Sequence, residues 1–518
     1  MQILRTDCLV IGAGLAGSAY ALRAAQLGLK VEILSLSEPL AANSDWAQGG
    51  IIFEPNGGAD VLARDIFEAS DRTANPVAVE HLVREGPTAV QELLLDELQV
   101  GFDRSESGEL HLTREGGHSE RRIIHAKDST GHAILSAIAT RVDRTPNISR
   151  RAGCVAIDLL TLSHTSNDLA DRYLPLTCFG AYVLDTTTGE TVAIIAKKTI
   201  LATGGLGQIF LHSTNQPGSV GHGVAMAYRV GARLIDLEYV QFHPTVFAKK
   251  NAPRFLVTEA LRGEGARILN ARGHPFMDTL DPRGSLASRD VVARAIKQEL
   301  AATGEACVYL DLSAMTAEFI RDRFPSIHQR CLHYGVDITK DPIPVVPAAH
   351  FACGGVHADL NGRTSVRHLN AIGETGCTGL HGANRLASTS LLECLVSAKF
   401  AALADGTDIA RETFHLPEPR EWESPIREAD PVLIRQDMQQ IQHTMWNYAG
   451  VVRSPKRLTR ARRILSELSE EIQTFYQGCR LTRELIDLRN AVQTALLVVH
   501  AAALNPHSRG CHYVTEEP

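Results

Sequence analysis

An apolar strand that runs into a glycine-rich turn stands near the start of the chain. The segment Cys8-Leu-Val-Ile11 is followed by Gly12-Ala-Gly-Leu-Ala-Gly17, a G-x-G-x-x-G pattern. In this pattern the first glycine permits a tight turn, the second lets the backbone approach a pyrophosphate, and the third lets a helix pack against the strand. We expect that helix at residues 18–27 and a second strand at 30–36. The pattern alone is weak, but its position between strand and helix predicts a Rossmann-like dinucleotide site.

The end of the second expected strand is where such a fold usually carries a ribose-binding acid. This chain has Ser35 and Leu36 there, and Glu32 is out of register. A serine hydroxyl can still donate a hydrogen bond to a ribose hydroxyl. Ser35 can therefore contact the ribose, but the chain has no acid at this position that would distinguish one dinucleotide from another.

Three further segments combine small residues, glycine and the end of an expected strand. They are Asn43-Ser-Asp-Trp-Ala-Gln-Gly-Gly50, Thr199-Ile-Leu-Ala-Thr-Gly-Gly205 and Asn370-Ala-Ile-Gly-Glu374. Adjacent glycines suit close contact of the backbone with a flat ring or a phosphate, although the first segment would also serve as an ordinary loop. Because these strand ends are spread from residue 12 to residue 374, they indicate one discontinuous FAD-binding domain with an insertion.

Composition excludes several classes of function. The 518 residues carry a net charge of -7, and there is no basic tract that would neutralise nucleic-acid phosphates. The ten cysteines form no C-x-x-C pair, so we expect no metal or iron–sulfur site and free thiols in a reducing cytoplasm. The apolar run at 495–503 is too short and too polar to span a bilayer. We expect no export signal and no membrane partner.

Acids and arginines are concentrated in Thr258-Glu-Ala-Leu-Arg-Gly-Glu264 and in Ser288-Arg-Asp290. Such residues are rarely buried unless they are paired. The cluster is therefore either a solvated surface or a working site, and on its own a solvated surface is the commoner outcome.

Four motifs resemble the flavoprotein family of fumarate reductases, succinate dehydrogenases and L-aspartate oxidases, and the resemblance covers nearly the whole chain. They are Ala47-Gln-Gly-Gly50, Gln241-Phe-His-Pro-Thr245, Thr258-Glu-Ala-Leu-Arg-Gly-Glu264, and His381-Gly-Ala-Asn-Arg385 followed by Ser390-Leu-Leu-Glu393. The resemblance implies an α/β fold: a Rossmann-like FAD-binding domain interrupted by an α+β capping domain and followed by a C-terminal three-helix bundle. The expected boundaries are 1–235 and 346–414 for the FAD-binding domain, 236–345 for the capping domain and 415–518 for the helical domain.

The resemblance also implies which residues bind FAD. In the membrane-complex members a histidine before Gln-Gly-Gly carries the flavin covalently, whereas this chain has Asn43 at the matching position, so we expect non-covalent FAD. The family usually has Gly-Asp-Gly where this chain reads Gly221-His-Gly223, so His222 takes that position with different chemistry. The expected FAD-binding residues are Gly12, Ala13, Gly14, Leu15, Gly17, Ser35, Leu36, Asn43, Ser44, Asp45, Trp46, Ala47, Gln48, Gly49, Gly50, Ala202, Thr203, Gly204, His222, Glu374, Ser390 and Leu391.

The family pattern places four residues around the substrate carboxylates. Each has a structural alternative: His243 and His350 as core histidines, Thr258 as a helix N-cap, Arg385 as an anchor. Because all four residues match the positions of one family pattern, the functional interpretation is favoured. Arginine in particular suits the role, since it binds carboxylates bidentately.

The acid/base residue implied by the resemblance is Arg289, with Glu259 and Arg262 as a proton relay. Because the pKa of a free guanidinium lies above 12, Arg289 can act as a base only if it passes its proton on as it accepts one. A purely electrostatic role for Arg289 is the alternative.

The segment His111-Leu-Thr-Arg-Glu-Gly-Gly-His-Ser119 resembles the version found in L-aspartate oxidases. Its acid, Glu115, matches the residue that reads the substrate ammonium group, and it would repel a second dianion. The alternative is an ordinary loop acid. The resemblance implies oxidation of L-aspartate to iminoaspartate with dioxygen or fumarate as acceptor, the first step of NAD biosynthesis, with a link to quinolinate synthase. The rival interpretations are a soluble fumarate reductase and an FAD-binding scaffold without turnover.

The composition changes after about residue 415. Pro417, Pro419 and Pro425 mark a linker. Apolar residues then recur at helical spacing over 433–449, 454–476 and 483–503. The basic stretch at 453–463 could bind nucleic acid, but the acidic stretch that follows it favours a solvated helical face. We expect three helices packed against the FAD-binding domain.

Overall fold

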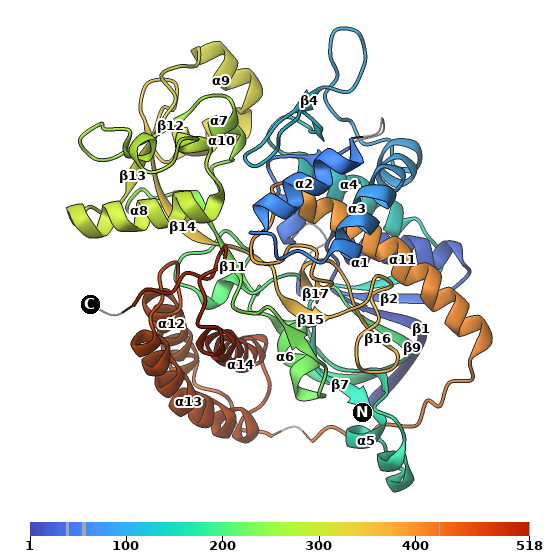
Figure 1. Cartoon of the computed structure of the whole chain (residues 1–518). Coiled ribbons are helices and arrows are strands. Elements are labelled where there is room, and N and C mark those ends of the chain that lie inside the picture. Colours follow the sequence, from blue (N-terminus) through green and yellow to red (C-terminus); the bar gives the residue numbers. More distant parts are fainter. Residues whose placement is uncertain (38–40, 54–57, 424, 517–518) are drawn as a thin grey trace.

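The computed structural model of the chain describes residues 1–37, 41–53, 58–423 and 425–516. Figure 1 shows a large α/β body, a smaller body of strands and helices beside it, and a group of C-terminal helices on the other side of the connecting strands. The predicted fold class is confirmed. Among the described residues, no helix is both long and apolar enough to cross a membrane.

A seven-stranded sheet forms the centre of the large body. Its strands run in the order β6-β2-β1-β9-β8-β7, and β16 also pairs with β9. The strands are β1 (Gln2–Ile11), β2 (Val31–Leu34), β6 (Ile148–Arg151), β7 (Cys154–Thr161), β8 (Cys178–Asp185), β9 (Glu190–Leu201) and β16 (Leu369–Ala371). The β6, β2, β1, β9 and β16 pairings are parallel, while β7 and β8 form an antiparallel extension.

The register of the parallel strands brings the glycine-rich turns together. Ile11 lies opposite both Leu34 and Leu201, and Leu201 also lies opposite Ala371. The carboxyl ends of β1, β2, β9 and β16 therefore meet at one edge of the sheet, which is where open α/β sheets bind their ligands.

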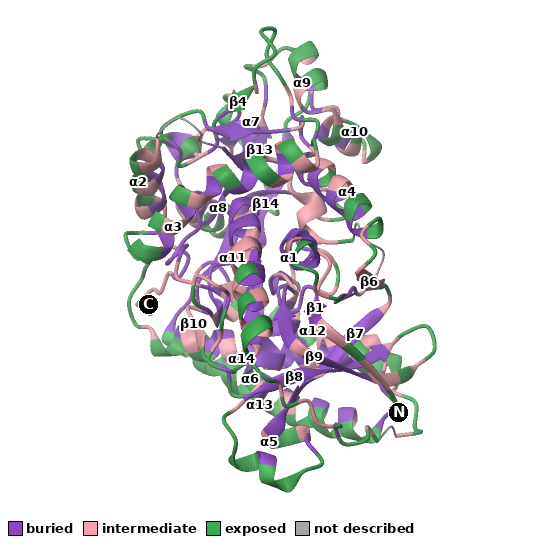
Figure 2. Cartoon of the chain, turned by 90° about the vertical axis from the view of Figure 1, so that its right-hand side faces the viewer, coloured by how far each residue is buried: buried purple, intermediate pink, exposed green. Residues whose placement is uncertain are grey.

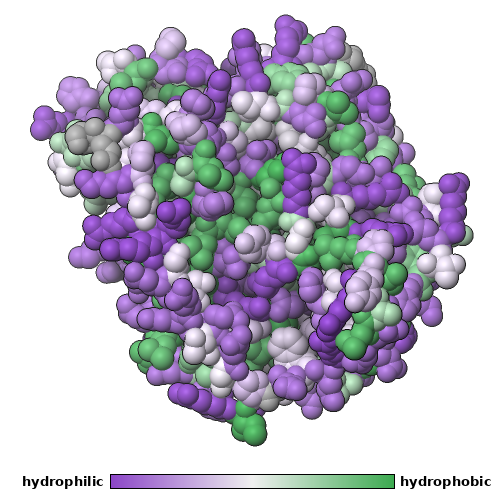
Figure 3. All heavy atoms as spheres, turned by 60° about the horizontal axis from the view of Figure 1, so that its bottom comes forward, coloured by the Kyte–Doolittle hydropathy of each residue, from purple (hydrophilic) through white to green (hydrophobic). Residues whose placement is uncertain are grey.

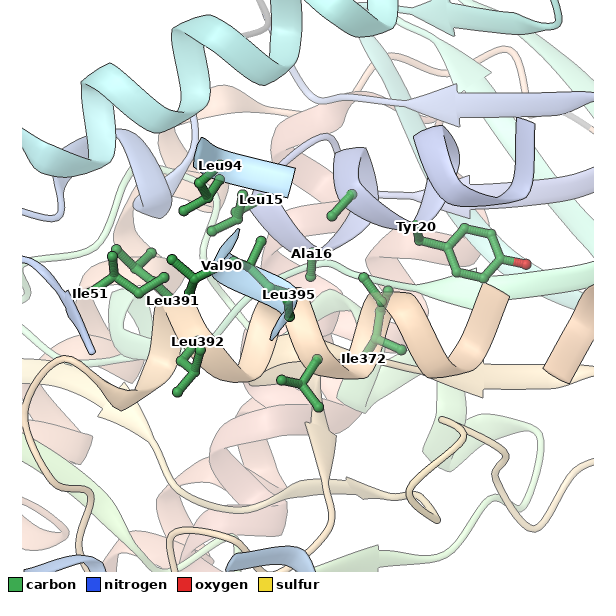
Figure 4. Packing of buried hydrophobic residues seen from close by; sticks show 14 of the residues in the cluster. Leu15, Ala16, Tyr20, Ile51, Val90, Leu94, Ile372, Leu391, Leu392 and Leu395 are labelled. Carbon is green, nitrogen blue, oxygen red and sulfur yellow. The ribbon is translucent and has the colours of Figure 1, made fainter. Parts of the chain in front are cut away.

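Two helices, α1 (Leu15–Gln26) and α11 (Thr389–Arg411), pack closely against one another over the sheet. Figure 4 shows Leu15, Ala16 and Tyr20 of α1 on one side of α11, with Leu391 and Leu395 of α11 turned toward that side and Leu392 pointing away from it. This packing fixes the position of the first turn of each helix. Figure 2 shows buried residues on the central strands and on the inner faces of the helices, while the outer faces are exposed.

Two long antiparallel strands, β11 (Val240–Phe247) and β14 (Ile343–Ala352), connect the smaller body to the large one. The sheet continues with β13 (Val308–Asp311), which pairs with β14, and with β12 (Arg267–Leu269), which pairs with β13. Apolar residues from Phe247 to Val345 in the sequence form a separate core of this body. Its helices are α7 (Ala260–Gly263), α8 (Arg289–Thr303), α9 (Ala317–Arg323) and α10 (Pro325–His333). The boundary residues of the expected capping domain stay a prediction.

The three expected C-terminal helices are present as α12 (Pro431–Tyr448), α13 (Pro455–Gly478) and α14 (Arg483–Leu504). Each begins at a polar N-cap whose side chain accepts a backbone hydrogen bond: Asp430, Ser454 and Thr482. Their apolar faces share one core with β7, β8 and β9. On the face seen in Figure 3, apolar residues form separate groups within a mostly hydrophilic surface.

The remaining elements connect these parts. They are η1 (Asn43–Trp46), β3 (Ile51–Ile52), α2 (Ala59–Ala69), α3 (Pro76–Ala89), η2 (Val90–Glu97), β4 (Leu112–Thr113), β5 (Ile123–Ile124), α4 (Thr130–Asp143), α5 (Leu162–Thr165), η3 (Leu169–Tyr173), η4 (Gly207–Ile209), α6 (His222–Arg229), β10 (Leu234–Ile235), η5 (Phe276–Thr279), η6 (Gly284–Leu286), β15 (Gly355–His357), η7 (Gly373–Thr375) and β17 (Gly376–Cys377).

Candidate active site

A cavity of about 150 Å³ lies at the carboxyl edge of the parallel strands. The turns after β1, β2, β9 and β16 all contribute to its wall, together with the start of α6. Of the residues expected to bind FAD, this cavity is lined by Gly12, Ala13, Gly14, Leu15, Ser35, Leu36, Asn43, Ser44, Ala202, Thr203, Gly204, His222 and Glu374.

The glycine-rich turn leaves room for a phosphate at this cavity. A Cβ added to Gly14 would meet only Ser44 Oγ at 3.6 Å and Ala42 Cβ at 3.8 Å, so a side chain there would stand in the cavity. The N-terminus of α1 lies at the same place, where the N–H groups of its first turn attract an anion, although that of Leu15 donates to Ser44 Oγ over 3.2 Å. A Cβ on Gly12, by contrast, would lie 2.1 Å from Ala202 O, which explains why the tight turn requires glycine. The residues present therefore fit the pyrophosphate of a dinucleotide.

Two of the expected FAD residues line neither this cavity nor the next. Gly17 lies under the turn, where a Cβ would meet Gly12 O at 2.0 Å, so its role is helix packing. The Asp45 carboxylate lies 2.8 Å from His132 Nδ1.

The Ser35 hydroxyl donates to Ser37 O over 2.7 Å, which leaves its oxygen as an acceptor rather than a donor for a ribose.

Asn43 joins two loops at the FAD cavity. Its Nδ2 donates to Ser219 Oγ over 3.2 Å, and its Oδ1 accepts from the backbone N–H of Gln216 at 2.7 Å. A carboxamide offers no nucleophile for a flavin bond. The loop is thus held by hydrogen bonds, in agreement with non-covalent FAD.

Glu374 lies where this cavity meets a second one. Burial raises the pKa of its carboxyl to about 7, although the backbone N–H of Ala352 donates to it over 2.9 Å. A Cβ on Gly205, in the turn after β9, would come within 2.1 Å of Glu374 Oε1, so a side chain at position 205 would collide with this acid.

The second cavity, of about 130 Å³, lies between the FAD-binding domain and the smaller body. It is lined by seven further residues that we expect to bind FAD: Trp46, Ala47, Gln48, Gly49, Gly50, Ser390 and Leu391. Seven of the residues expected to act on the substrate also line it: Glu115, His243, Thr258, Glu259, Arg289, His350 and Arg385. The structure thus brings together residues from distant parts of the chain, and the alternative that the acid and arginine cluster is a solvated surface is wrong.

Glu259 bridges two arginines. Its Oε2 accepts from Arg289 Nε at 2.6 Å, and its Oε1 accepts from Arg262 Nη2 at 2.7 Å. Burial by itself would raise the pKa of Glu259, but Arg289 and Arg262 outweigh it and hold the pKa below the ordinary value. The carboxylate is therefore ionised and keeps both guanidinium groups fixed.

Gln241 organises the other side of Arg289, and sequence reasoning did not single it out. Its Oε1 accepts from Arg289 Nη1 at 2.9 Å and from Arg385 Nη2 at 3.2 Å. Its Nε2 donates to Asn384 Oδ1 over 2.7 Å and to Arg385 O over 2.8 Å. Gln241 opens the motif that contains His243, which is the signal that could have identified it.

Both expected histidines are neutral. Burial lowers the pKa of His243 and of His350 well below 6.5, and Arg289 adds to the effect in each case. The two rings lie 5.1 Å apart, and His350 Nδ1 is 2.7 Å from Thr214 Oγ1. Neutral imidazoles of this kind can hydrogen-bond to a carboxylate without competing with the arginines for charge.

Thr258 and Arg385 have structural contacts as well as a place at the cavity. Thr258 Oγ1 accepts from the backbone N–H of Ala260 at 3.3 Å, at the start of α7, but the N-cap of this helix is Glu259 and not Thr258. Arg385 stacks over the Phe351 ring at 4.2 Å and donates to Ser390 Oγ over 2.9 Å. Burial and the charge of Arg289 lower the pKa of Arg385 to about 10, so it stays cationic at neutral pH.

Glu115 is a buried acid at the same cavity and not a loop acid in solvent, because only 5 % of its surface is exposed. Ser388 Oγ donates to its Oε2 over 2.5 Å. Burial and the charge of Glu259 raise the pKa of Glu115, while Arg289, Ser388 and Arg385 oppose them. Ser388 has a positive φ of 58° at the start of α11, so the backbone is bent to present this hydroxyl.

Comparison with known proteins agrees with this site. The model of the FAD binding domain family matches residues 7–391, and the one described as fumarate reductase flavoprotein C-term matches residues 438–518. L-aspartate oxidase 1 of Ralstonia nicotianae is 43% identical over 99% of this chain and 95% of its own length. L-aspartate oxidase of Pseudomonas aeruginosa is 43% identical over 100% and 96%, and the chloroplastic enzyme of Arabidopsis thaliana 40% identical over 99% and 81%.

Solved structures show the same architecture. A variant of the E. coli quinol fumarate reductase flavoprotein superposes with a TM-score of 0.88 at 26% identity, covering 100% of this chain and 92% of that one. Sdh1 of Mycobacterium smegmatis gives a TM-score of 0.83 at 28% identity, covering 99% and 89%. With these full-length matches and an FAD-binding domain, the chain belongs to the L-aspartate oxidases, within the flavoprotein family of fumarate reductases and succinate dehydrogenases.

Proposed function

We propose that this protein oxidises L-aspartate to iminoaspartate with non-covalent FAD. The observation that carries the proposal is the buried Glu115 carboxylate in a cavity otherwise equipped to bind carboxylates. FAD, when bound, supplies hydride acceptance. The residues of the chain orient the substrate, balance its charge and remove its proton.

The substrate carboxylates are assigned to Arg385, His243, His350 and Thr258. These side chains lie on different elements around one cavity and offer a guanidinium, two neutral imidazoles and a hydroxyl. Hydrogen bonds from a charged donor to a carboxylate are short and strong, and a planar guanidinium also fixes the orientation of the carboxylate.

Glu115 is assigned to the substrate ammonium group. With Glu115 ionised and Glu374, whose pKa burial raises to about 7, in its neutral form, Arg262, Arg289 and Arg385 exceed Glu115 and Glu259 by one positive charge, which balances the single net negative charge of L-aspartate. A dicarboxylate without an amino group has two negative charges and would leave Glu115 without a cation. An uncompensated buried charge is costly, so the site favours the amino acid.

Arg289 is assigned to proton removal, with Glu259 and Arg262 as its relay. The short contacts from Glu259 to both guanidinium groups support a path in which Arg289 hands on a proton as it accepts one. Such a path lets Arg289 act as a base without remaining neutral.

Fumarate or dioxygen is assigned as the electron acceptor, and iminoaspartate as the product that quinolinate synthase would consume in NAD biosynthesis. The same arginines and histidines would bind the two carboxylates of fumarate. We assign the protein to the cytoplasm, and we keep residues 236–345 as the capping domain, because the core of the smaller body is separate from that of the sheet.

The test is the absorbance of the bound flavin under anaerobic conditions, with L-aspartate added to one sample and succinate to another. Loss of the flavin absorbance with L-aspartate alone is the expected result. Loss with succinate alone would move the protein to fumarate–succinate chemistry, and loss with dithionite only would support a scaffold without turnover.

A further inference from the structure

Residues 508–513, which we call the C-terminal strap, follow α14 and run from the C-terminal helices toward α8 of the smaller body (Figure 1). Arg453 holds one end of the strap, because its Nη1 donates to His512 Nδ1 over 2.7 Å and its backbone N–H donates to the Tyr513 oxygen over 3.0 Å. His512 and Arg453 are both completely buried. The strap is therefore fixed to the helical domain.

The strap also lies directly on the loop that precedes Arg385. The backbone N–H of Cys511 donates to the Ala383 oxygen over 2.9 Å, and Cys511 Sγ donates to Asn384 Oδ1 over 3.1 Å. Gly510 has a positive φ of 44°, and a Cβ there would lie 2.5 Å from the same Ala383 oxygen. The contact is thus so close that position 510 requires glycine.

Arg294 joins the strap to α8, the helix whose first residue is Arg289. Its Nη1 donates to the Gly510 oxygen over 2.9 Å, and its guanidinium lies over the Tyr513 ring at 5.1 Å. Its Nη2 pairs with Asp290 Oδ2 at 2.9 Å. One arginine can make these contacts together because its donors form a planar fork whose face also stacks on aromatic rings. The strap therefore connects α8 to the FAD-binding domain.

Asn384 links the same helix to the pair of arginines at the candidate active site. Its Nδ2 donates to Asp290 Oδ1 over 3.2 Å, and its Oδ1 accepts from Gln241 Nε2 at 2.7 Å. Gln241 Oε1 in turn accepts from Arg289 and from Arg385. A continuous series of contacts thus runs from the strap to the residue that both arginines share.

Arg289 and Arg385 are not tightly packed on the side of the strap. A cavity of about 520 Å³ lies there, and its wall includes both arginines together with Arg294, Gly510 and Tyr513. Close packing would fix the two arginines by itself, since packed interiors resist displacement. At this cavity their relative position depends instead on hydrogen bonds and ion pairs, among them those of Arg294.

We propose that the C-terminal strap sets the position of Arg289: through Arg294 it holds α8 against the loop of Arg385, so that the proposed base reaches a substrate bound at the proposed carboxylate anchor. Arg294 is a positioning residue, because it acts through Arg289 and does not line the substrate cavity. The helical domain then contributes to catalysis, although no residue of it lines that cavity in the described part of the chain. The inference rests on the proposed oxidation of L-aspartate.

The first test is Arg294→Met, which keeps the aliphatic length and removes the donors. We expect the rate constant of flavin reduction at saturating L-aspartate to fall about tenfold, because small displacements of a catalytic group are costly. The dissociation constant of L-aspartate should change by less than about threefold, since the assigned carboxylate anchors are not on α8, and FAD content should not change. Rapid mixing under anaerobic conditions measures both constants. The control is Arg321→Met, at an exposed arginine on α9 of the same body.

The second test displaces the strap without replacing a charged residue. Gly510→Ala places a Cβ against the Ala383 oxygen and should also lower the rate constant about tenfold. Gly304→Ala is its control, because this glycine ends α8 with a positive φ of 72° and has nothing within 4 Å of the added carbon. Since both changes act through the same strap, the double variant Arg294→Met/Gly510→Ala should lose little more than either single variant.

Equal rate constants for Arg294→Met and Arg321→Met, or additive losses in the double variant, would overturn the proposal. Labelling of Cys511 by a maleimide needs no substrate. Only 5 % of the surface of Cys511 is exposed, so labelling, identified by peptide mass, should rise in Arg294→Met and Gly510→Ala and in neither control. A parent protein whose flavin L-aspartate does not reduce would refute the proposed function, whereas unchanged labelling of Cys511 would refute the role of the strap.

Discussion

Arg289 and Arg385 donate to the same oxygen atom, Gln241 Oε1, over 2.9 and 3.2 Å. The carboxamide holds two cations side by side without cancelling their charge, whereas a carboxylate at the same place would reduce the attraction for a substrate anion. The amide nitrogen is in turn bonded to Asn384 Oδ1 and Arg385 O. The relative position of the proposed base and the proposed carboxylate anchor therefore depends on one neutral side chain.

Replacement of Gln241 by leucine should disturb this geometry while preserving volume. We expect kcat for L-aspartate to fall at least tenfold, because the two guanidinium groups lose a shared hydrogen bond and misplaced catalytic groups are costly. FAD content should not change. Steady-state kinetics with flavin absorbance measure both quantities. The matched control is Gln298→Leu, an exposed position on the helix that carries Arg289. A normal kcat would mean that Gln241 only fills space.

Replacement of Arg289 by leucine should abolish reduction of the bound flavin by L-aspartate and leave FAD bound. Loss of a general base costs about 10²- to 10⁴-fold. Rapid mixing under anaerobic conditions gives the rate of reduction directly. Arg272→Leu, on an exposed turn of the same body, is the control. If substantial reduction persists, Arg289 has an electrostatic role only.

The sequence predicted the fold, and nearly all of the residues that it assigned to a site line one of the two cavities, because glycine-rich turns and family motifs are local. The turn at Gly12 requires glycine at a fixed place after a strand, and that requirement is visible in the chain. The residues it did not reveal act over long distances. Gln241 and Ser388 are ordinary polar residues in the sequence, and they acquire their roles only where β11 and the start of α11 meet the cavity.

The sequence also does not show which contacts a single side chain makes within a correctly predicted motif. Thr258 accepts a backbone hydrogen bond at the start of α7 and also lines the cavity, so a structural contact does not exclude a place at the site. Asp45 lies within a cofactor-binding loop, yet its carboxylate turns to His132, because alternate side chains of a short 3₁₀ turn point in different directions. Spacing along the chain does not determine which way such a side chain points.

Replacement of Glu115 by glutamine should weaken the binding of L-aspartate without weakening the binding of fumarate. The variant keeps the shape and the bond to Ser388 but loses the charge that pairs with ammonium. We expect L-aspartate to bind about 10- to 100-fold more weakly, since hydrogen bonds to charged groups contribute more than neutral ones. Fumarate should bind at least as well as before. Flavin spectral titrations measure both constants, and an unchanged constant for L-aspartate would contradict the assignment.

Binding of the two ligands should depend on pH in opposite directions. The pKa of Glu115 is raised above its ordinary value of 4.5 by burial and by Glu259. The pKa of Glu259 is lowered and those of His243 and His350 lie well below 6.5, while burial raises the pKa of Glu374 to about 7. Protonation of Glu374 removes a negative charge that repels both ligands, so opposite trends for the two ligands identify Glu115. As pH falls through the pKa of Glu115, the acid is protonated, so L-aspartate should bind more weakly and fumarate more tightly. Both ligands keep their carboxylates ionised above about pH 5.

Titrations from neutral pH down to pH 5 with each ligand test this expectation. The Glu115→Gln variant is the control, because it lacks this carboxyl and should lose the opposition between the two trends; any response that Glu374 adds has the same direction for both ligands. Parallel trends for the two ligands in the parent protein would show that another group governs the response.

Replacement of Gly116 by alanine should displace the proposed relay without touching a charged residue. A Cβ at this position would lie 2.3 Å from Glu259 Oε1, which is closer than real contacts permit. Glu259 is buried and held by Arg262 and Arg289, so its carboxylate cannot move without loosening at least one of these pairs. We expect kcat to fall about tenfold or more, with FAD affinity unchanged. Gly101→Ala, where nothing lies within 4 Å of the added carbon, is the matched control. Equal kcat for the two variants would show that the position of the Glu259 carboxylate does not limit proton removal.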